Sequence, residues 1–158
     1  MRTLALAAAL ALPVHAQALE CVVETPEWLW YVATESKDRM LPVYGRFSRP
    51  LGPVELGGVV AMDMREARFS ARFEGRALTK RGFTHRMQAE VEVDVPCIDA
   101  ACADLPYGKP VMALLTETAA GWELNLGPCV DPLIEYPSPA ERHRMRDCLR
   151  GRCADEGN

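Results

Sequence analysis

The stretch that decides the fold is ARFSARFEGRALTKRGFTHRMQAEVEVDVP, residues 67–96. Apolar or small residues alternate with polar ones over residues 67–77, and again over residues 87–95, where most of the polar residues are acidic. A period of two is typical of a strand with one buried face. A helix competes for the first half, because its arginines also recur at a helical spacing, but the second half has no such alternative. The two halves therefore predict two antiparallel strands.

The turn between these strands fixes their register. A three-residue loop, Lys80-Arg81-Gly82, puts glycine where the backbone needs a positive φ, which a Cβ would resist. If Thr79 then pairs with Phe83, opposite charges align on the outer face and apolar side chains on the inner face, and a slip of one residue destroys both matches. The predicted pairs are Arg72 with Glu90, Arg68 with Asp94, Phe73 with Ala89, and Phe69 with Val93.

The other elements follow from similar patterns. Residues 41–48 predict a strand, residues 49–58 a turn with a short edge strand, and VMALLTETAAGWELNL a second hairpin. Its strands are Val111–Thr118 and Trp122–Leu126, joined by Ala119-Ala120-Gly121. A helix over about residues 139–150 is predicted by a Ser138 cap, Pro139 at the first position, Glu141 three residues after the cap, and Gly151 beyond the end.

The segment TPEWLWYVATES, residues 25–36, is ambiguous. Thr25 and Pro26 would start a helix, whereas the β-branched and aromatic side chains suit a strand. We expect a strand there. With at least five strands and one late helix, the chain is predicted to be mainly β: an antiparallel sandwich or a small barrel, of OB or netrin-like type, with a C-terminal α-helix and disulfide staples.

Part of this layout resembles a known family. A strand with VYGRFS (residues 43–48), a long hairpin, a cysteine loop and a VMALL strand (residues 111–115) resemble the netrin-like, five-stranded barrels of metalloprotease inhibitors over about half the chain. Those inhibitors chelate the metal of their target through an N-terminal cysteine. Here Cys21 would follow Leu19 and Glu20, so the resemblance implies a barrel without implying that activity.

The first 18 residues, MRTLALAAALALPVHAQA, have the layout of a secretory signal peptide. Arg2 precedes an apolar run that is about half the roughly 20 residues a spanning helix needs. We expect residues 1–18 to be removed, leaving residues 19–158 as one β-rich domain that is secreted or periplasmic. The formal net charge of −4 becomes more negative when Arg2 leaves, which disfavours nucleic acid as a partner. No later segment predicts a membrane span.

All six cysteines lie after the predicted leader, and an even number in an exported chain indicates a disulfide framework. We expect Cys97–Cys102 and Cys148–Cys153 as local clips and Cys21–Cys129 as a long bridge; a rival pairing joins Cys129 to a tail cysteine. The two C-x4-C pairs compete weakly as a zinc site. Neither has the two-residue spacing of a catalytic dithiol.

The sequence constrains the function less than it constrains the fold. The four serines include no nucleophile elbow, no phosphate-binding glycine loop is present, and Glu90, Glu92 and Asp94 should face arginines, so we do not expect an enzyme. We expect a binding or accessory protein that needs no cofactor and holds a protein or cell-envelope component. The candidate contact residues are Trp28, Trp30, Tyr31, Arg68, Arg72 and Arg76. The alternative is a copper-handling protein with ligands His85, Met87, Met62 and Met64.

Overall fold

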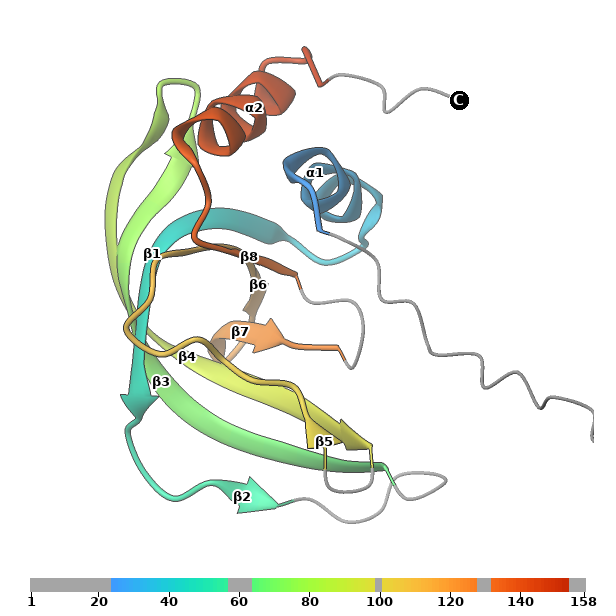
Figure 1. The fold of residues 1–158 in the computed structure, drawn as a ribbon, viewed down its shortest axis with the longest axis vertical. Coiled ribbons are helices and arrows are strands. Elements are labelled where there is room, and N and C mark those ends of the chain that lie inside the picture. The colour runs from blue at the N-terminus through green and yellow to red at the C-terminus, as the bar shows by residue number, and fades with distance from the viewer. Residues whose placement is uncertain (1–23, 57–63, 99–100, 128–131, 154–158) are drawn as a thin grey trace, which may run out of the picture.

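The computed structural model describes residues 24–56, 64–98, 101–127 and 132–153 of the chain. The elements in order are α1 (Pro26–Glu35), β1 (Met40–Pro50), β2 (Glu55–Leu56), β3 (Met64–Thr79), β4 (Gly82–Ile98), β5 (Ala101–Cys102), β6 (Val111–Thr118), β7 (Gly121–Asn125), β8 (Leu133–Glu135) and α2 (Pro139–Leu149). The protein is mainly β with a C-terminal helix, as predicted. The two helices lie side by side at one end of the sheet (Figure 1). The predicted leader, Cys21, Cys129 and Met62 fall outside the described residues.

The long hairpin β3–β4 has the predicted register. Arg68 pairs with Asp94 and Arg72 with Glu90, and the inner pairs Phe69–Val93 and Phe73–Ala89 are also formed. Near the tip the prediction is wrong by one residue. A bulge between Ala77 and Leu78 lets Thr79 pair with Gly82, which leaves a two-residue turn. Gly82 has a φ of 101°, the positive value for which glycine was expected.

The second predicted hairpin differs in the same way. Thr118 of β6 pairs with Gly121 of β7, so its turn also has two residues. Gly121 has a φ of 139°. In both hairpins the glycine that was assigned to the loop is the first residue of the returning strand. A glycine with positive φ at that position is typical of a bulge that adjusts the twist next to a turn.

The sheet is mixed, which corrects the expectation of an antiparallel sheet. Its strand order is β2-β3-β1-β6-β7-β4-β5, with β8 on β6 and an additional pairing between β3 and β4. The pairing of β4 with β7 is parallel. The reason is the crossover after β5, which carries the chain to β6 beside β1. β7, the second strand of the β6–β7 hairpin, then lies beside β4 and runs in the same direction as β4 (Figure 1). Alternation along single strands cannot reveal such a crossover.

The sheet buries side chains on both faces. Its inner face carries the larger core, with Phe47, Phe73 and Val93 among the buried residues. The opposite face is covered by the helices at one end, where Leu29 of α1 and Met145 of α2 pack with Met112. β6 lies between the two cores. Residues 111–116 of β6 are all buried, as expected of a strand covered on both sides.

The expectation of a strand over residues 25–36 is wrong, because the segment forms α1. The Thr25 hydroxyl accepts a hydrogen bond of 3.1 Å from the Trp28 amide, and Pro26 opens the helix. Leu29 is fully buried, and Val32 and Ala33 are packed against the same core, at the spacing of one helix face. The capping signals and this face outweigh the strand propensity of the aromatic and β-branched residues.

α2 confirms the predicted helix and its cap. Ser138 and Glu141 form a reciprocal capping box, with Pro139 at the first helical position. The predicted disulfide Cys148–Cys153 is formed at the end of the helix. No helix among the described residues is long and apolar enough to cross a membrane.

Candidate functional site

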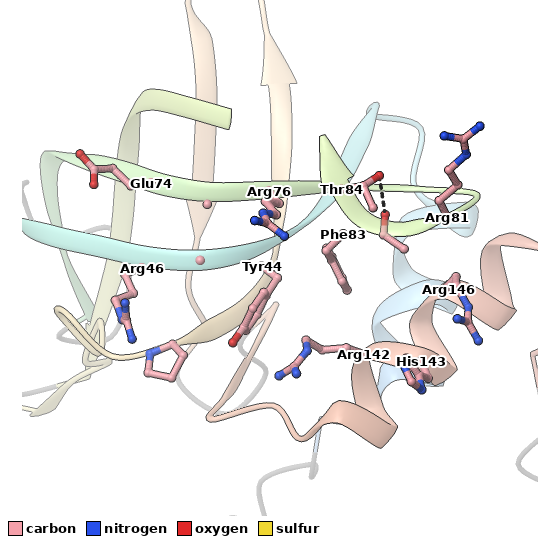
Figure 2. Close-up of a pocket in the computed structure, with 14 residues that line it drawn as sticks. Tyr44, Arg46, Glu74, Arg76, Arg81, Phe83, Thr84, Arg142, His143 and Arg146 are labelled. Carbon is pink, nitrogen blue, oxygen red and sulfur yellow. Dashed lines mark hydrogen bonds between the residues drawn. The ribbon is translucent and has the colours of Figure 1, made fainter. Parts of the chain in front are cut away.

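A basic pocket lies where the outer face of β1 and β3, the tip of the β3–β4 hairpin and α2 meet (Figure 2). Its volume is about 520 Å³, within the range of pockets that hold small molecules. Its lining includes His143 and the charged residues Arg46, Glu74, Arg76, Arg81, Arg142 and Arg146. Five arginines therefore share the pocket with one carboxylate. We call this set of residues the arginine pocket.

Two glycines shape the floor of the arginine pocket. Gly45 of β1 and Gly75 of β3 are a direct cross-strand pair. A Cβ on either glycine would collide with the backbone of the facing strand and with the Phe73 ring. The Phe73 ring therefore lies across both glycines on the inner face. Because side chains alternate along a strand, the residues on either side of each glycine point to the outer face, toward the pocket.

The wall between sheet and helix is built around Tyr44. The Arg142 guanidinium of α2 lies 4.6 Å from the centroid of the Tyr44 ring, a cation–π contact. Arg142 also donates a hydrogen bond of 2.7 Å to the Pro137 carbonyl. On the hairpin side, the ring of Phe83 is 5.9 Å from that of Tyr44. Figure 2 shows Phe83 between Tyr44 and the tip of the hairpin, with Arg142 below them.

Of the five arginines of the pocket, only Arg146 has an anionic partner within the described part of the chain. Arg46, Arg76 and Arg81 form no ion pair there. Glu74 is the cross-strand neighbour of Arg46, but the two side chains point apart in Figure 2. Arg76 is directly opposite Arg86 across the hairpin, a like-charge pair that destabilises a sheet. The pocket therefore holds positive charge that the fold leaves uncompensated.

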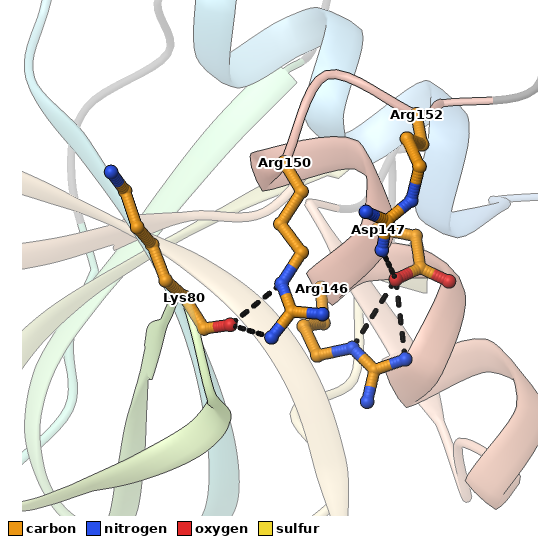
Figure 3. A network of polar contacts seen from close by, with 5 residues as sticks. All are labelled: Lys80, Arg146, Asp147, Arg150 and Arg152. Atoms are coloured by element: carbon orange, nitrogen blue, oxygen red, sulfur yellow. Dashed lines mark hydrogen bonds and ion pairs between the residues drawn. The ribbon is translucent and has the colours of Figure 1, made fainter.

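The hairpin tip is tied to the end of α2 (Figure 3). The Arg150 guanidinium donates two hydrogen bonds to the Lys80 carbonyl, one of them 2.7 Å from Nε. Asp147 accepts hydrogen bonds from Arg152 at 2.7 Å and from Arg146 at 3.2 Å. The hydrogen bond from Arg152, with a smaller contribution from Arg146, lowers the pKa of Asp147. The Cys148–Cys153 disulfide closes the loop that carries Arg150 and Arg152, so it stabilises the contacts that these two arginines make with Lys80 and Asp147.

The three arginines that sequence singled out have different surroundings. Arg76 lines the arginine pocket. Arg68 is paired with Asp94 and, at 3.0 Å, with Glu92, and the hydrogen bond to Asp94 raises its pKa. Arg72 is exposed opposite Glu90. Of the three candidate arginines, Arg68 and Arg72 thus face carboxylates, and Arg76 belongs to the pocket.

The aromatic candidates lie on α1. Trp28 and Trp30 are half-buried and packed against the core under the helices, whereas Tyr31 is 61% exposed. Because α1 is a helix, Trp28 and Trp30 point in different directions and do not form the shared face that a strand would give. None of the three lines the arginine pocket.

Three of the four candidate copper ligands, all but Met62, lie among the described residues, and they are spread along the β3–β4 hairpin. His85 is exposed on β4, and Met87, two residues further along, packs against the inner core. Met64 pairs with Ile98 at the opposite end of the hairpin from the His85–Ala77 pair. Among the described residues, no three or more His, Cys, Asp or Glu side chains are grouped to hold a metal ion. Separately, the backbone places Cys97 opposite Cys102, as the predicted clip requires.

Several residues of the arginine pocket were not predicted from the sequence. Tyr44 and Arg46 are on β1 and Arg142 and Arg146 on α2, far along the chain from Arg76. One signal was present: Arg142 and Arg146 are four residues apart, so they share one face of the predicted helix. No protein-family model, no curated protein and no solved structure matches this chain.

Proposed function

We propose that this protein is an exported binding protein whose arginine pocket holds an anionic ligand. The observation that carries the proposal is the uncompensated charge of Arg46, Arg76 and Arg81 beside the arginines of α2. Guanidinium groups bind phosphate and carboxylate through several directed hydrogen bonds, and clusters of arginine are a recurrent means of recognising such groups.

The charge of the whole chain supports a local site. The formal net charge is −4, so the arginine pocket is a positive region on an acidic protein. A general polyelectrolyte binder would instead be basic overall. The proposed ligand is therefore recognised by contacts within the pocket, and long-range attraction contributes little.

The like-charge pair of Arg76 and Arg86 supports the same proposal. Elsewhere on the outer face of this hairpin the arginines of β3 meet carboxylates of β4, as Arg68 meets Asp94. At the pocket an arginine of β3 faces an arginine of β4 instead, and this like-charge pair lowers the stability of the sheet. Sites at which a chain gives up stability are frequently sites of function, because the unfavourable charge is relieved when the ligand binds.

The scaffold that we infer for this site is a small closed barrel. Following the pairings, β3, β1, β6, β7 and β4 each join the next strand, and β4 joins β3 again. This ring of pairings supports a five-stranded barrel of OB or netrin-like type over a sandwich. A closed scaffold would hold the strands that carry Arg46 and Arg76 at a fixed separation, so the pocket would be preformed.

Export of the protein is also part of the proposed function. The signal-like leader and the Cys148–Cys153 disulfide support an oxidising compartment, either secreted or periplasmic. The ligand would then be a component of the envelope or of its surroundings, met by an accessory protein that performs no chemistry on it.

The proposal is tested by calorimetric titration of the processed protein with inorganic phosphate, tripolyphosphate and citrate. We expect at least one of these anions to bind, and we expect Arg76→Ala and Arg81→Ala each to weaken its affinity about tenfold, since each removes charge-assisted hydrogen bonds. Arg72→Ala is the matched control, because it removes the same charge from the same face of β3 outside the pocket. Failure of all three anions to bind would contradict the proposal, as would an equal loss in the control.

A further inference from the structure

We infer that the ligand of the arginine pocket is a compact molecule with two or more phosphoryl groups, such as an oligophosphate or a bisphosphorylated small molecule. This inference rests on the proposed anion-binding function and specifies its ligand class. Three features of the pocket lead to it: its size relative to its charge, the directions from which its donors come, and the charge of the surface beside it.

The size of the pocket leaves room for more than one anionic group. An orthophosphate has five heavy atoms and would fill on the order of 150 Å³ at the volume per atom of liquid water. The pocket has about 520 Å³. A single phosphate could therefore touch only part of the lining, and some of Arg46, Arg76 and Arg81 would stay uncompensated. An oligophosphate of three units, with about 13 heavy atoms, would occupy on the order of 390 Å³ and could reach all three.

The donors surround the pocket, and they do not lie in one plane. Arg46 comes from β1, Arg76 from β3, Arg81 from the hairpin turn, and Arg142 and Arg146 from α2. In Figure 2, Arg46 and Arg76 lie on the sheet and Arg142 and Arg146 on the helix, while the Arg81 side chain extends from the turn away from these four. A carboxylate accepts hydrogen bonds in a single plane through two oxygens, whereas a terminal phosphoryl group offers three oxygens that point in different directions. Donors from several directions therefore fit phosphoryl groups better than carboxylates.

The surface beside the pocket limits the length of the ligand. Further along the same hairpin lies a groove lined by Glu90, Glu92 and Glu123, and Glu92 and Glu123 are neighbours across β4 and β7. This groove also includes Ser70, six residues along β3 from Arg76 and hence about 20 Å away. An extended polyanion that followed the hairpin would run into these carboxylates and be repelled. The ligand must fit within the arginine pocket.

The neighbours of the pocket support a rigid site. Arg142 is held by the Tyr44 ring and the Pro137 carbonyl, and Arg146 by Asp147. Arg150 fixes the hairpin tip, from which Arg81 projects, through the Lys80 carbonyl. Arginines that are already oriented lose less conformational freedom on binding, which favours selection by the shape and geometry of the anionic groups.

The inference is tested by calorimetric titration of the processed protein, at one fixed ionic strength, with orthophosphate, tripolyphosphate, citrate and a short DNA duplex. Citrate carries several carboxylates, and the duplex is an extended, rigid polyanion. We expect tripolyphosphate to bind about tenfold or more tightly than each of the other three, because only it can satisfy several of the separated arginines within the pocket. Arg46→Ala and Arg81→Ala should each weaken tripolyphosphate binding by about tenfold and should affect orthophosphate less.

The outcomes separate this inference from the proposed function. If citrate binds as tightly as tripolyphosphate, or orthophosphate does, the pocket binds anions but does not require several phosphoryl groups, and the ligand class is wrong. If the duplex binds as tightly, the requirement for a compact ligand is wrong. If none of the four binds, both the inference and the proposed function are overturned. Circular dichroism of each alanine variant establishes that the exposed substitutions leave the fold intact.

Discussion

At the scale of single residues, Gly45 and Gly75 form the floor of the arginine pocket. The two are paired across β1 and β3, and a Cβ on either would meet backbone atoms of the facing strand. Backbone cannot move aside as the end of a flexible side chain can. The pair therefore depends on the absence of side chains, and the Phe73 ring occupies the inner side of both positions.

We expect Gly75→Ala to lower the free energy of unfolding by about 1–3 kcal/mol, the range for an overpacked site. Gly52→Ala is the matched control, since a Cβ at Gly52 meets no atom within 4 Å. Urea denaturation followed by circular dichroism measures both. Equal stability of the two variants would show that β1 and β3 are not in close contact at this point.

Arg86 offers a test of the uncompensated charge. In Arg86→Glu a carboxylate would face Arg76 across the hairpin, as Glu90 faces Arg72. We expect the free energy of unfolding to rise by roughly 0.2–1 kcal/mol, because an opposite-charge pair replaces a like-charge pair. We also expect weaker binding of tripolyphosphate, because Arg76 would then have a partner.

The control for this change is Arg86→Gln, which removes the repulsion without providing a carboxylate. It should stabilise the hairpin slightly and leave the affinity for tripolyphosphate close to that of the original protein. Thermal denaturation and calorimetry measure the two effects. If Arg86→Glu were less stable than Arg86→Gln, Arg76 and Arg86 would not be cross-strand neighbours.

At the scale of elements, α2 provides the helical side of the pocket, and its start is fixed by the capping box of Ser138 and Glu141. The Ser138 amide donates to the Glu141 carboxylate at 2.6 Å, and the Glu141 amide donates to the Ser138 hydroxyl at 3.2 Å. The hydrogen bonds with Ser138 lower the pKa of Glu141 from its ordinary value of 4.5. The ionised carboxylate is therefore the form that stabilises the helix.

The lowered pKa gives a pH dependence with a definite sign. The contribution of Glu141 is complete above its ordinary pKa of 4.5 and is lost as the pH falls through the lower value of the folded state. We expect Glu141→Gln, which keeps an acceptor but does not titrate, to lose less stability than the original protein between about pH 7 and about pH 3.

At neutral pH, Ser138→Ala should reduce the free energy of unfolding by about 1 kcal/mol. Urea titrations at the two pH values test both expectations. A Glu141→Gln variant with the same acid sensitivity as the original protein would contradict the first.

Some of the helices and strand pairings were predicted from the sequence, and others were not. The β3–β4 hairpin was predicted with its register, except at its tip, because alternation, charge and a glycine turn all act within 30 or so consecutive residues. α2 was predicted from its caps. α1 was missed, because its aromatic and β-branched residues suit a strand, and the caps decide in favour of a helix only together with packing against Met145 and Met112. The parallel pairing of β4 with β7 was missed because it depends on the crossover between distant segments.

At the scale of the whole molecule, the arginine pocket is assembled from β1, the β3–β4 hairpin and α2. Of its residues, Arg76 was among the candidate contact residues named from the sequence. The sequence could not separate Arg76 from Arg68, because the pairing of each arginine across the hairpin decides whether its charge is compensated. Nor could it bring Arg46 and Arg142 to the same place, since that requires the tertiary fold.

Export and the disulfide framework are also properties of the whole chain. We expect the exported protein to lack residues 1–18 and to gain six hydrogens when its six cysteines are reduced. Intact-mass spectrometry of the exported protein, with and without reductant, measures both. A mature protein with six free thiols would contradict the disulfide framework, and an uncleaved leader would contradict export by the expected route.

The most direct measurement of the central claim is an NMR titration that follows the arginine Nε–Hε signals of the processed protein as tripolyphosphate is added. We predict that the signals of Arg46, Arg76 and Arg81 shift together and saturate at one equivalent, whereas the signals of Arg39 and Arg68, which are paired with Glu117 and with Asp94, stay in place. Shifts spread evenly over all the arginines, or confined to those outside the pocket, would contradict the claim that the arginine pocket is the binding site.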